Sequence, residues 1–190
     1  DATYEQLNAA LGFKTSPVTG LWFNIYGGYQ DLKNNLASAA IANYSGSYLQ
    51  LLQGNMHNIY AGAEASYSYK DIISFTASGI YRDWKTAKTE NNSGDQLLYY
   101  MPSFEANFKV DIRPISSVLI NLGYQHITRE KIGNERVDPV GNLYLGGSYE
   151  VFEGISIYVR ANNLLNKDYQ YYPGYPTEGI NFMGGVSFRF

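Results

Sequence analysis

The chain ends, over residues 180–190, with the stretch INFMGGVSFRF. Every second residue of this stretch is apolar or a glycine, namely Phe182, Gly184, Val186, Phe188 and Phe190. The residues between them include Ser187 and Arg189. Because successive side chains of a strand point to opposite faces, this alternation predicts a β-strand with one apolar and one polar face.

The same alternation recurs upstream, most clearly over residues 73–81, 103–110, 118–125 and 155–162. We find no convincing long amphipathic helix. The sequence predicts strands at residues 4–15, 21–30, 56–69, 72–84, 97–110, 118–128, 140–149, 155–163 and 180–190. The predicted fold class is all-β, an antiparallel up-and-down transmembrane β-barrel of which about 8–10 strands are present.

The connections between the predicted strands alternate in length. Short turns at residues 16–20, 70–71, 111–117 and 150–154 alternate with longer loops at residues 31–55, 85–96, 129–139 and 164–179. In an up-and-down meander every second connection lies at the same end, so the short turns gather at one end together with the C-terminus. Barrels of the bacterial outer membrane have this asymmetry, with short periplasmic turns and long extracellular loops.

The composition agrees with a barrel wall and excludes several other classes. Charged residues make up only 16% of the chain, aromatic residues another 16%, and there is no cysteine. The sequence contains no run of about 18 apolar residues, the length that a transmembrane helix needs. The mean hydropathy of −0.29 still fits transmembrane strands, because they alternate apolar and polar residues. The net charge of −3 is too small to indicate a nucleic-acid partner.

The charged residues in the middle of the predicted strands fall on the polar face. They are Lys14, Glu64, Glu105, Lys109, Arg160 and Arg189. A charge facing lipid at the membrane midplane costs roughly 2–4 kcal/mol in a barrel, so these residues would face the lumen. A soluble sheet with one wet face has the same pattern, and the sorted loops are what favours the membrane.

Several segments near the C-terminus resemble a known family. NNLLNKDY at residues 162–169, PGYP at residues 173–176 and GGVSFRF at residues 184–190 closely resemble the end of TonB-dependent receptors. Residues 58–67 and 101–114 are similar to the later barrel strands of that family. Family members often carry Pro-Gly-Arg before the last strand, whereas residues 177–179 here are TEG. The departure weakens an assignment to a subfamily.

The resemblance implies a role for the whole chain. Residues 1–190 would be the C-terminal part of a receptor barrel of about 22 strands in a Gram-negative outer membrane. The plug domain, the N-terminal strands and the segment that contacts TonB would lie outside this chain. The implied function is TonB-energised uptake of a scarce nutrient, such as an iron–siderophore complex or cobalamin, and outer-membrane lipid would surround the barrel.

The resemblance also implies roles for particular residues. The last strand would be read by the barrel-assembly machinery through Phe182, Val186, Phe188 and Phe190. Ligand contacts are expected from tyrosines of the predicted long loops, namely Tyr44, Tyr48, Tyr171, Tyr172 and Tyr175. Contacts with the plug or the solute path are expected from Glu64, Glu105, Lys109, Arg160 and Arg189.

Motifs of enzymes, cofactors and metals do not appear in the sequence. The two histidines, His57 and His126, lie far apart in the chain, and HExxH, GxSxG and P-loop patterns do not occur. Asp71, Asp111 and Asp138 are expected in turns or loops, where aspartate normally caps the backbone. We therefore predict no catalytic residue, cofactor or metal site.

Two other functions stay open from the residues alone. One is a small complete barrel of eight or ten strands that acts as a membrane anchor or minor pore, and the other is a soluble β-barrel that binds a ligand inside. The predicted strand number is odd and the first strand starts at the long-loop end, whereas single-chain bacterial barrels have even numbers. We therefore expect upstream strands to be missing from this chain.

Overall fold

The structure is a computed structural model that describes residues 2–43, 46–86, 98, 101–132, 135–172 and 175–189. The backbone is described for residues 36–43, 46–53, 132, 135–136 and 172, but their side chains are not. Among the described residues there is no helix long and apolar enough to cross a membrane.

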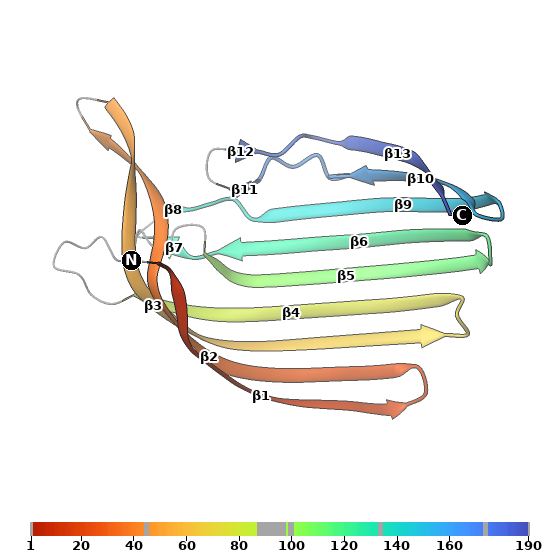
Figure 1. Ribbon diagram of the computed structural model, residues 1–190, viewed down its shortest axis with the longest axis horizontal. Helices are drawn as coiled ribbons and strands as arrows, with labels where there is room; N and C mark the ends of the chain where they lie inside the picture. The colour runs from red at the N-terminus through yellow and green to blue at the C-terminus, as the bar shows by residue number, and fades with distance from the viewer. Residues whose placement is uncertain are drawn as a thin grey trace.

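One antiparallel sheet of nine strands contains most of the chain, and its strand order follows the sequence (Figure 1). The strands are β1 (Tyr4–Val18), β2 (Leu21–Asn43), β3 (Gly46–Tyr69), β4 (Ile73–Thr86), β5 (Pro102–Ile115), β6 (Val118–Arg129), β9 (Val140–Phe152), β10 (Ile155–Asn162) and β13 (Asn181–Phe188). All nine predicted strands are confirmed. Two small hairpins join them, β7 (Lys131–Ile132) with β8 (Glu135–Arg136), and β11 (Gln170–Tyr172) with β12 (Tyr175–Pro176).

The short turns lie together at one end of the sheet, where the C-terminus also lies, and the longer connections lie at the other end (Figure 1). Lys70 and Asp71 both have positive φ angles, of 47° and 55°. Two consecutive left-handed residues are typical of the tight turns that match the twist of a hairpin. The short turns therefore gather at the predicted end, together with the C-terminus.

The first predicted long loop, residues 31–55, is wrong. In the structure β2 and β3 stay paired through most of this segment, for example Ser38 with Leu51, up to Asn43 and Gly46. The register shifts between Leu32 and Asn35, and Asn34 has a φ angle of 53°. Asparagine accepts this left-handed conformation, so a bulge forms here and the strand continues where a loop was predicted. Beyond it the hairpin bends away from the direction of the other strands (Figure 1).

The two faces of the sheet carry different kinds of side chain, and this difference extends from one edge strand to the other. Register places apolar residues beside each other on one face, as in the row Ala77, Phe108, Tyr124 and Leu143. Many large side chains of this face are exposed, and Phe182 reaches 79%. Soluble proteins rarely expose apolar patches of more than a few hundred Å². The exposed apolar face therefore requires an apolar surrounding.

Candidate functional site

The polar face of the sheet is the candidate functional surface. Register joins Lys14, Asn24, Glu64 and Ser78 into one row across β1 to β4. Asn107, Gln125 and Asn142 continue the same row across β5, β6 and β9. Four predicted lumen residues, Glu64, Glu105, Lys109 and Arg160, lie on this face, and Arg189 follows β13. Their contact with a plug or solute stays a prediction.

Most charges on the polar face have a partner close by. Arg82 Nη1 donates to Glu105 Oε2 at 2.9 Å, and Lys109 Nζ lies 2.8 Å from Asp111 Oδ2. Asn24 donates a long hydrogen bond, 3.5 Å, to Glu64. The wall of the proposed lumen is therefore polar without a strong excess of one charge sign.

The partners of Arg160 are an amide and an aromatic ring, and the partner of Arg189 is a distant carboxylate. Arg160 Nε donates to Asn162 Oδ1 at 2.8 Å, and its guanidinium lies 4.3 Å from the centre of the Tyr144 ring. Arg189 reaches only within 4.0 Å of Glu150 and is largely exposed. A cation over an aromatic ring is stabilised by the ring quadrupole, so Tyr144 holds Arg160 against the wall.

Tyrosine rings on this face lie over glycines of neighbouring strands. Tyr26 covers Gly62, Tyr60 covers Gly28, Tyr144 covers Gly123 and Tyr158 covers Gly185. A Cβ atom at any of these glycines would collide with the tyrosine ring above it. Glycine within a strand marks a close approach of another group. The rings therefore lie along the wall instead of projecting from it.

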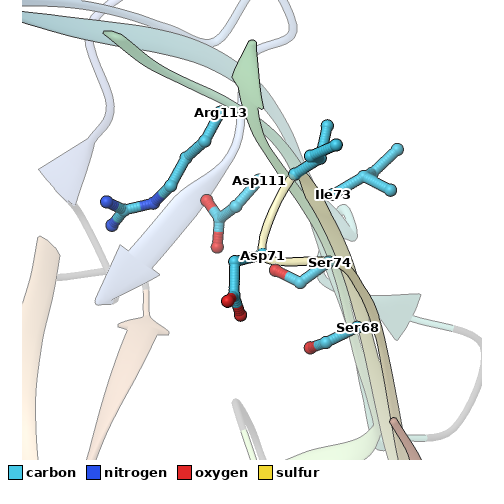
Figure 2. Close-up of a pocket in the computed structure, with 7 residues that line it drawn as sticks. Ser68, Asp71, Ile73, Ser74, Asp111 and Arg113 are labelled. Atoms are coloured by element: carbon cyan, nitrogen blue, oxygen red, sulfur yellow. The ribbon is translucent and has the colours of Figure 1, made fainter. Parts of the chain in front are cut away.

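A cavity of about 390 Å³ opens on the same face at the short-turn end, and Ser68, Asp71, Ser74, Asp111 and Arg113 line it. Figure 2 shows these five side chains on one side of the strands and Ile73 on the other; strands from both ends of the chain are seen on the polar side. The sheet thus curves around its polar face. Asp111 Oδ1 has no hydrogen-bond partner among the described residues. The cavity is suited to N–H donors.

The position of Asp111 differs from the sequence-based prediction. The turn was expected at residues 111–117, with Asp111 capping the backbone. Instead, Asp111 lies inside β5, opposite Asn121 of β6, and its carboxylate pairs with Lys109. Pairing continues to Ile115 and Val118, so only two residues remain for the turn. Asp111 is therefore a residue of the polar wall that the sequence analysis missed, although its even spacing from Lys109 was the available signal.

The last long connection, between β10 and β13, is tied down at the opposite end of the sheet. Asn163 is fully buried, and its Nδ2 donates to the backbone oxygens of Lys167 and Glu178 at 2.9 and 3.0 Å. Arg129, also buried, donates from Nη2 to the backbone oxygen of Gln170 at 2.7 Å. Burial raises the pKa of the Tyr169 hydroxyl in this connection to about 12. Asn163, in the NNLLNKDY segment, therefore fixes the connection through its side-chain hydrogen bonds.

The predicted ligand-contact tyrosines have different positions. The Tyr171 hydroxyl donates to Gln125 Oε1 at 2.7 Å and so contacts the polar wall. Tyr175 is exposed. Tyr44 lies outside the described residues, and so do the side chains of Tyr48 and Tyr172. Ligand contact stays a prediction for all five.

The residues predicted as an assembly signal lie on β13, which is an edge strand of the sheet. Phe182, Val186 and Phe188 are exposed on the apolar face. Phe190 lies outside the described residues. β13 pairs with β10 along its whole length through the ladder from Asn162 and Asn181 to Ile155 and Phe188.

The two histidines lie apart in the described sheet, on its apolar side. His126 contacts the rings of Phe104 and Tyr124, and its Nε2 lies 2.9 Å from Thr128 Oγ1. His57 packs against Tyr29. No group of three His, Cys, Asp or Glu side chains suited to a metal ion occurs among the described residues.

Comparison with known proteins gives the fold. No family model and no curated protein matches the sequence. Among solved structures, the copper transporter OprC superimposes with a TM-score of 0.71 at 19% identity, over 96% of this chain and 31% of that one. The chain therefore shares its fold with part of the β-barrel of this protein.

Two iron receptors give similar values. The ferric enterobactin receptor PfeA of Pseudomonas aeruginosa has a TM-score of 0.68 at 16% identity, over 96% of this chain and 31% of its own. The ferric-catecholate import receptor Fiu of E. coli K12 has a TM-score of 0.68 at 14% identity, over 96% and 27%. The predicted fold class is confirmed, and the resemblance to TonB-dependent receptors holds at the level of the fold. This chain spans about a third of the length of these receptors.

Proposed function

We propose that this chain forms one arc of the barrel of a TonB-dependent receptor in a Gram-negative outer membrane. The observation that carries the proposal is the division of the sheet into an exposed apolar face and a polar face with paired charges. A transmembrane barrel needs this arrangement, apolar toward lipid and polar toward the lumen. The curvature toward the polar side supports the same orientation (Figure 2).

The arc requires further strands to close. β1 and β13 are the edges of the nine-stranded sheet. Unpaired backbone groups are not tolerated in the hydrocarbon region, because no water is present there to bond them. We propose that strands outside this chain pair with both edges, that a plug domain outside it fills the lumen, and that TonB acts through that other part. The barrel-assembly machinery would recognise β13.

The proposed cargo is a scarce nutrient of the metal-chelate class, an iron–siderophore complex or cobalamin. Support comes from the copper transporter and the two ferric-siderophore receptors that share the fold. The residues proposed to contact cargo are the loop tyrosines, and those proposed to contact the plug are the charges of the polar wall. The chain is proposed to have no enzymatic role.

Uptake by the strain that carries the gene tests this function. We expect the protein to fractionate with the outer membrane, and deletion of the gene to abolish accumulation of one labelled chelate among ferric catecholates, cobalamin and copper. Complementation with a gene whose product cannot engage TonB should not restore it. Recovery of the protein in a soluble fraction, or unchanged accumulation of every chelate, would overturn the proposal.

Native mass spectrometry of the purified protein in detergent distinguishes the small-barrel alternative. A second polypeptide that separates only on denaturation, or a single chain much longer than 190 residues, supports the arc. A folded particle with the mass of one 190-residue chain would instead support a small complete barrel that acts as an anchor or minor pore.

A further inference from the structure

The apolar face changes to a charged surface at one level of the sheet. Along β4 the residues of this face are Ile73, Phe75, Ala77, Gly79 and Tyr81, and the next two are Asp83 and Lys85. Along β2 they are Leu21, Phe23, Ile25, Gly27 and Tyr29, and the next two are Asp31 and Lys33. On β3, which lies between them, Ile59 is followed by His57. Three adjacent strands thus become polar at the same height.

Register and ion pairs join these residues into one array. Asp31 lies opposite His57, and His57 lies opposite Lys85. Lys33 Nζ lies 3.1 Å from Asp31, and Lys85 Nζ lies 3.0 Å from Asp83. His57 packs against the Tyr29 ring. We call Asp31, Lys33, His57, Asp83 and Lys85 the outer charged row.

The height of the row matches the edge of a membrane. The apolar stretch of β4 from Ile73 to Tyr81 is nine residues long. A tilted transmembrane strand needs about 9–11 residues to cross the hydrocarbon core. The row lies at the long-loop end of this stretch, where lipid headgroups meet the protein.

The cations of the row are more exposed than its acids. The side chain of Lys85 is 62% exposed and that of Asp83 is 49% exposed, and the values for Lys33 and Asp31 are 26% and 19%. Each carboxylate holds its lysine in place on the face, yet an ammonium group has three N–H donors. Donors therefore remain for an anion that approaches from the lipid side.

We propose that the outer charged row binds phosphate groups of lipid headgroups in the leaflet at the long-loop end. The inference rests on the membrane position given under the proposed function. Lysines at this depth keep their stems on apolar surface and their charged ends at the interface. Each lysine can donate charge-assisted hydrogen bonds to a phosphate, and His57 lies on the strand between theirs.

A matched control is present in the same sheet. Lys109 and Asp111 form the same pair two residues apart, at 2.8 Å, but on the polar face. The Lys109→Gln variant removes one lysine from an identical pair that lipid does not reach. The Lys33→Gln and Lys85→Gln variants remove the cations of the row, and Lys→Arg at both positions retains the charge.

The experiment measures lipid retained by the intact protein. The protein that contains this chain is purified from its membrane, delipidated in mild detergent and titrated with phosphatidic acid or with diacylglycerol of the same acyl chains, with bound lipid counted by native mass spectrometry. We expect phosphatidic acid to bind about fivefold more weakly for each row lysine changed to Gln, because a basic residue near the surface contributes about 1 kcal/mol. Lys109→Gln and the arginine variants should bind as the wild type does.

Two results would overturn the inference. The first is equal retention of phosphatidic acid by the wild type and by the double Gln variant. The second is a loss in Lys109→Gln as large as that in the row variants, because only the overall charge would then determine binding. A spin label at the position of Ile59 distinguishes failure of the headgroup site from failure of the proposed function. A label that lipid-soluble oxygen does not reach refutes the membrane position itself, whereas a reachable label without phosphate preference refutes only the headgroup site.

Discussion

Arg82 and Glu105 join β4 to β5 diagonally across the polar face, with Nη1 and Oε2 separated by 2.9 Å. Their register partners are Tyr60 and Ile127, so the pair lies in the middle of the wall, with strands on both sides. Both side chains remain partly exposed, which allows water to screen the interaction.

Removal of one charge of this pair should have a small effect on stability. We expect Glu105→Gln to lower the free energy of unfolding by at most about 1 kcal/mol, because partly exposed ion pairs contribute about that much or less. A double-mutant cycle with Arg82→Gln, measured by urea unfolding in detergent, gives the coupling energy. A coupling energy well above this value would indicate a pair that water does not reach.

A larger side chain at a glycine that lies under a tyrosine ring should destabilise the sheet. Gly123→Val places a side chain under the Tyr144 ring, and we expect a loss of about 1–3 kcal/mol from the overpacking. Thermal unfolding followed by circular dichroism measures it. Gly79→Val is the control, because a Cβ at Gly79 meets its nearest atom at an ordinary 3.7 Å.

A second substitution tests the cause of that loss. Tyr144→Ala removes the ring, and its combination with Gly123→Val should recover part of the lost stability. If the double variant is as unstable as the sum of the two single variants, the contact between ring and glycine is not the reason.

Asn163 should control the order of the connection between β10 and β13. Its side chain donates two hydrogen bonds and accepts one from Lys167 N, and its φ angle is 51°. Asn163→Ala loses these bonds and adds strain, whereas Asn163→Gly loses the bonds but accepts the φ angle. We expect amide hydrogen exchange in residues 164–169 to rise in both, more in the alanine variant. Equal, unchanged protection in both variants would contradict this anchoring role.

The same connection should open at alkaline pH. Burial raises the pKa of Tyr169 to about 12, above its ordinary value of 10. Because the folded pKa is the higher one, the stabilising contribution is complete below pH 10 and is lost as pH rises to 12. A fluorophore attached at exposed residue 167 should report opening in this range. Tyr169→Phe should remove that transition, and a transition that persists in this variant must have another origin.

The strands and their faces were predictable because each follows from neighbouring residues. A period of two needs only a few consecutive side chains, so Phe104 and Phe108 are enough to assign a face in β5. Contacts between strands depend on register, which no single segment contains. The sequence therefore placed Glu105 on the polar face but did not identify its partner Arg82, although Arg82 has the spacing of Ser74 and Ser78 on that face.

Both wrong predictions involve residue types, asparagine and aspartate, that occur in turns and also within strands. Residues 31–55 were predicted as a loop, yet Asn34 accepts the left-handed angle of a bulge, and the pairing of β2 with β3 resumes beyond it. Asp111 appeared to begin a turn because aspartate is common there, yet a lysine two residues away stabilises it within a strand. In both places the continuing ladder outweighed the local preference.

The bulge at Asn34 also gives the β2–β3 hairpin a mechanical property. The eight residues from 36 to 43 span roughly 26 Å beyond it as extended chain. A change of about ten degrees in the bend at the bulge would displace the far end of that lever by roughly 5 Å, a distance comparable to the spacing between two strands. A local rearrangement of one asparagine is thereby amplified at the far end of the hairpin.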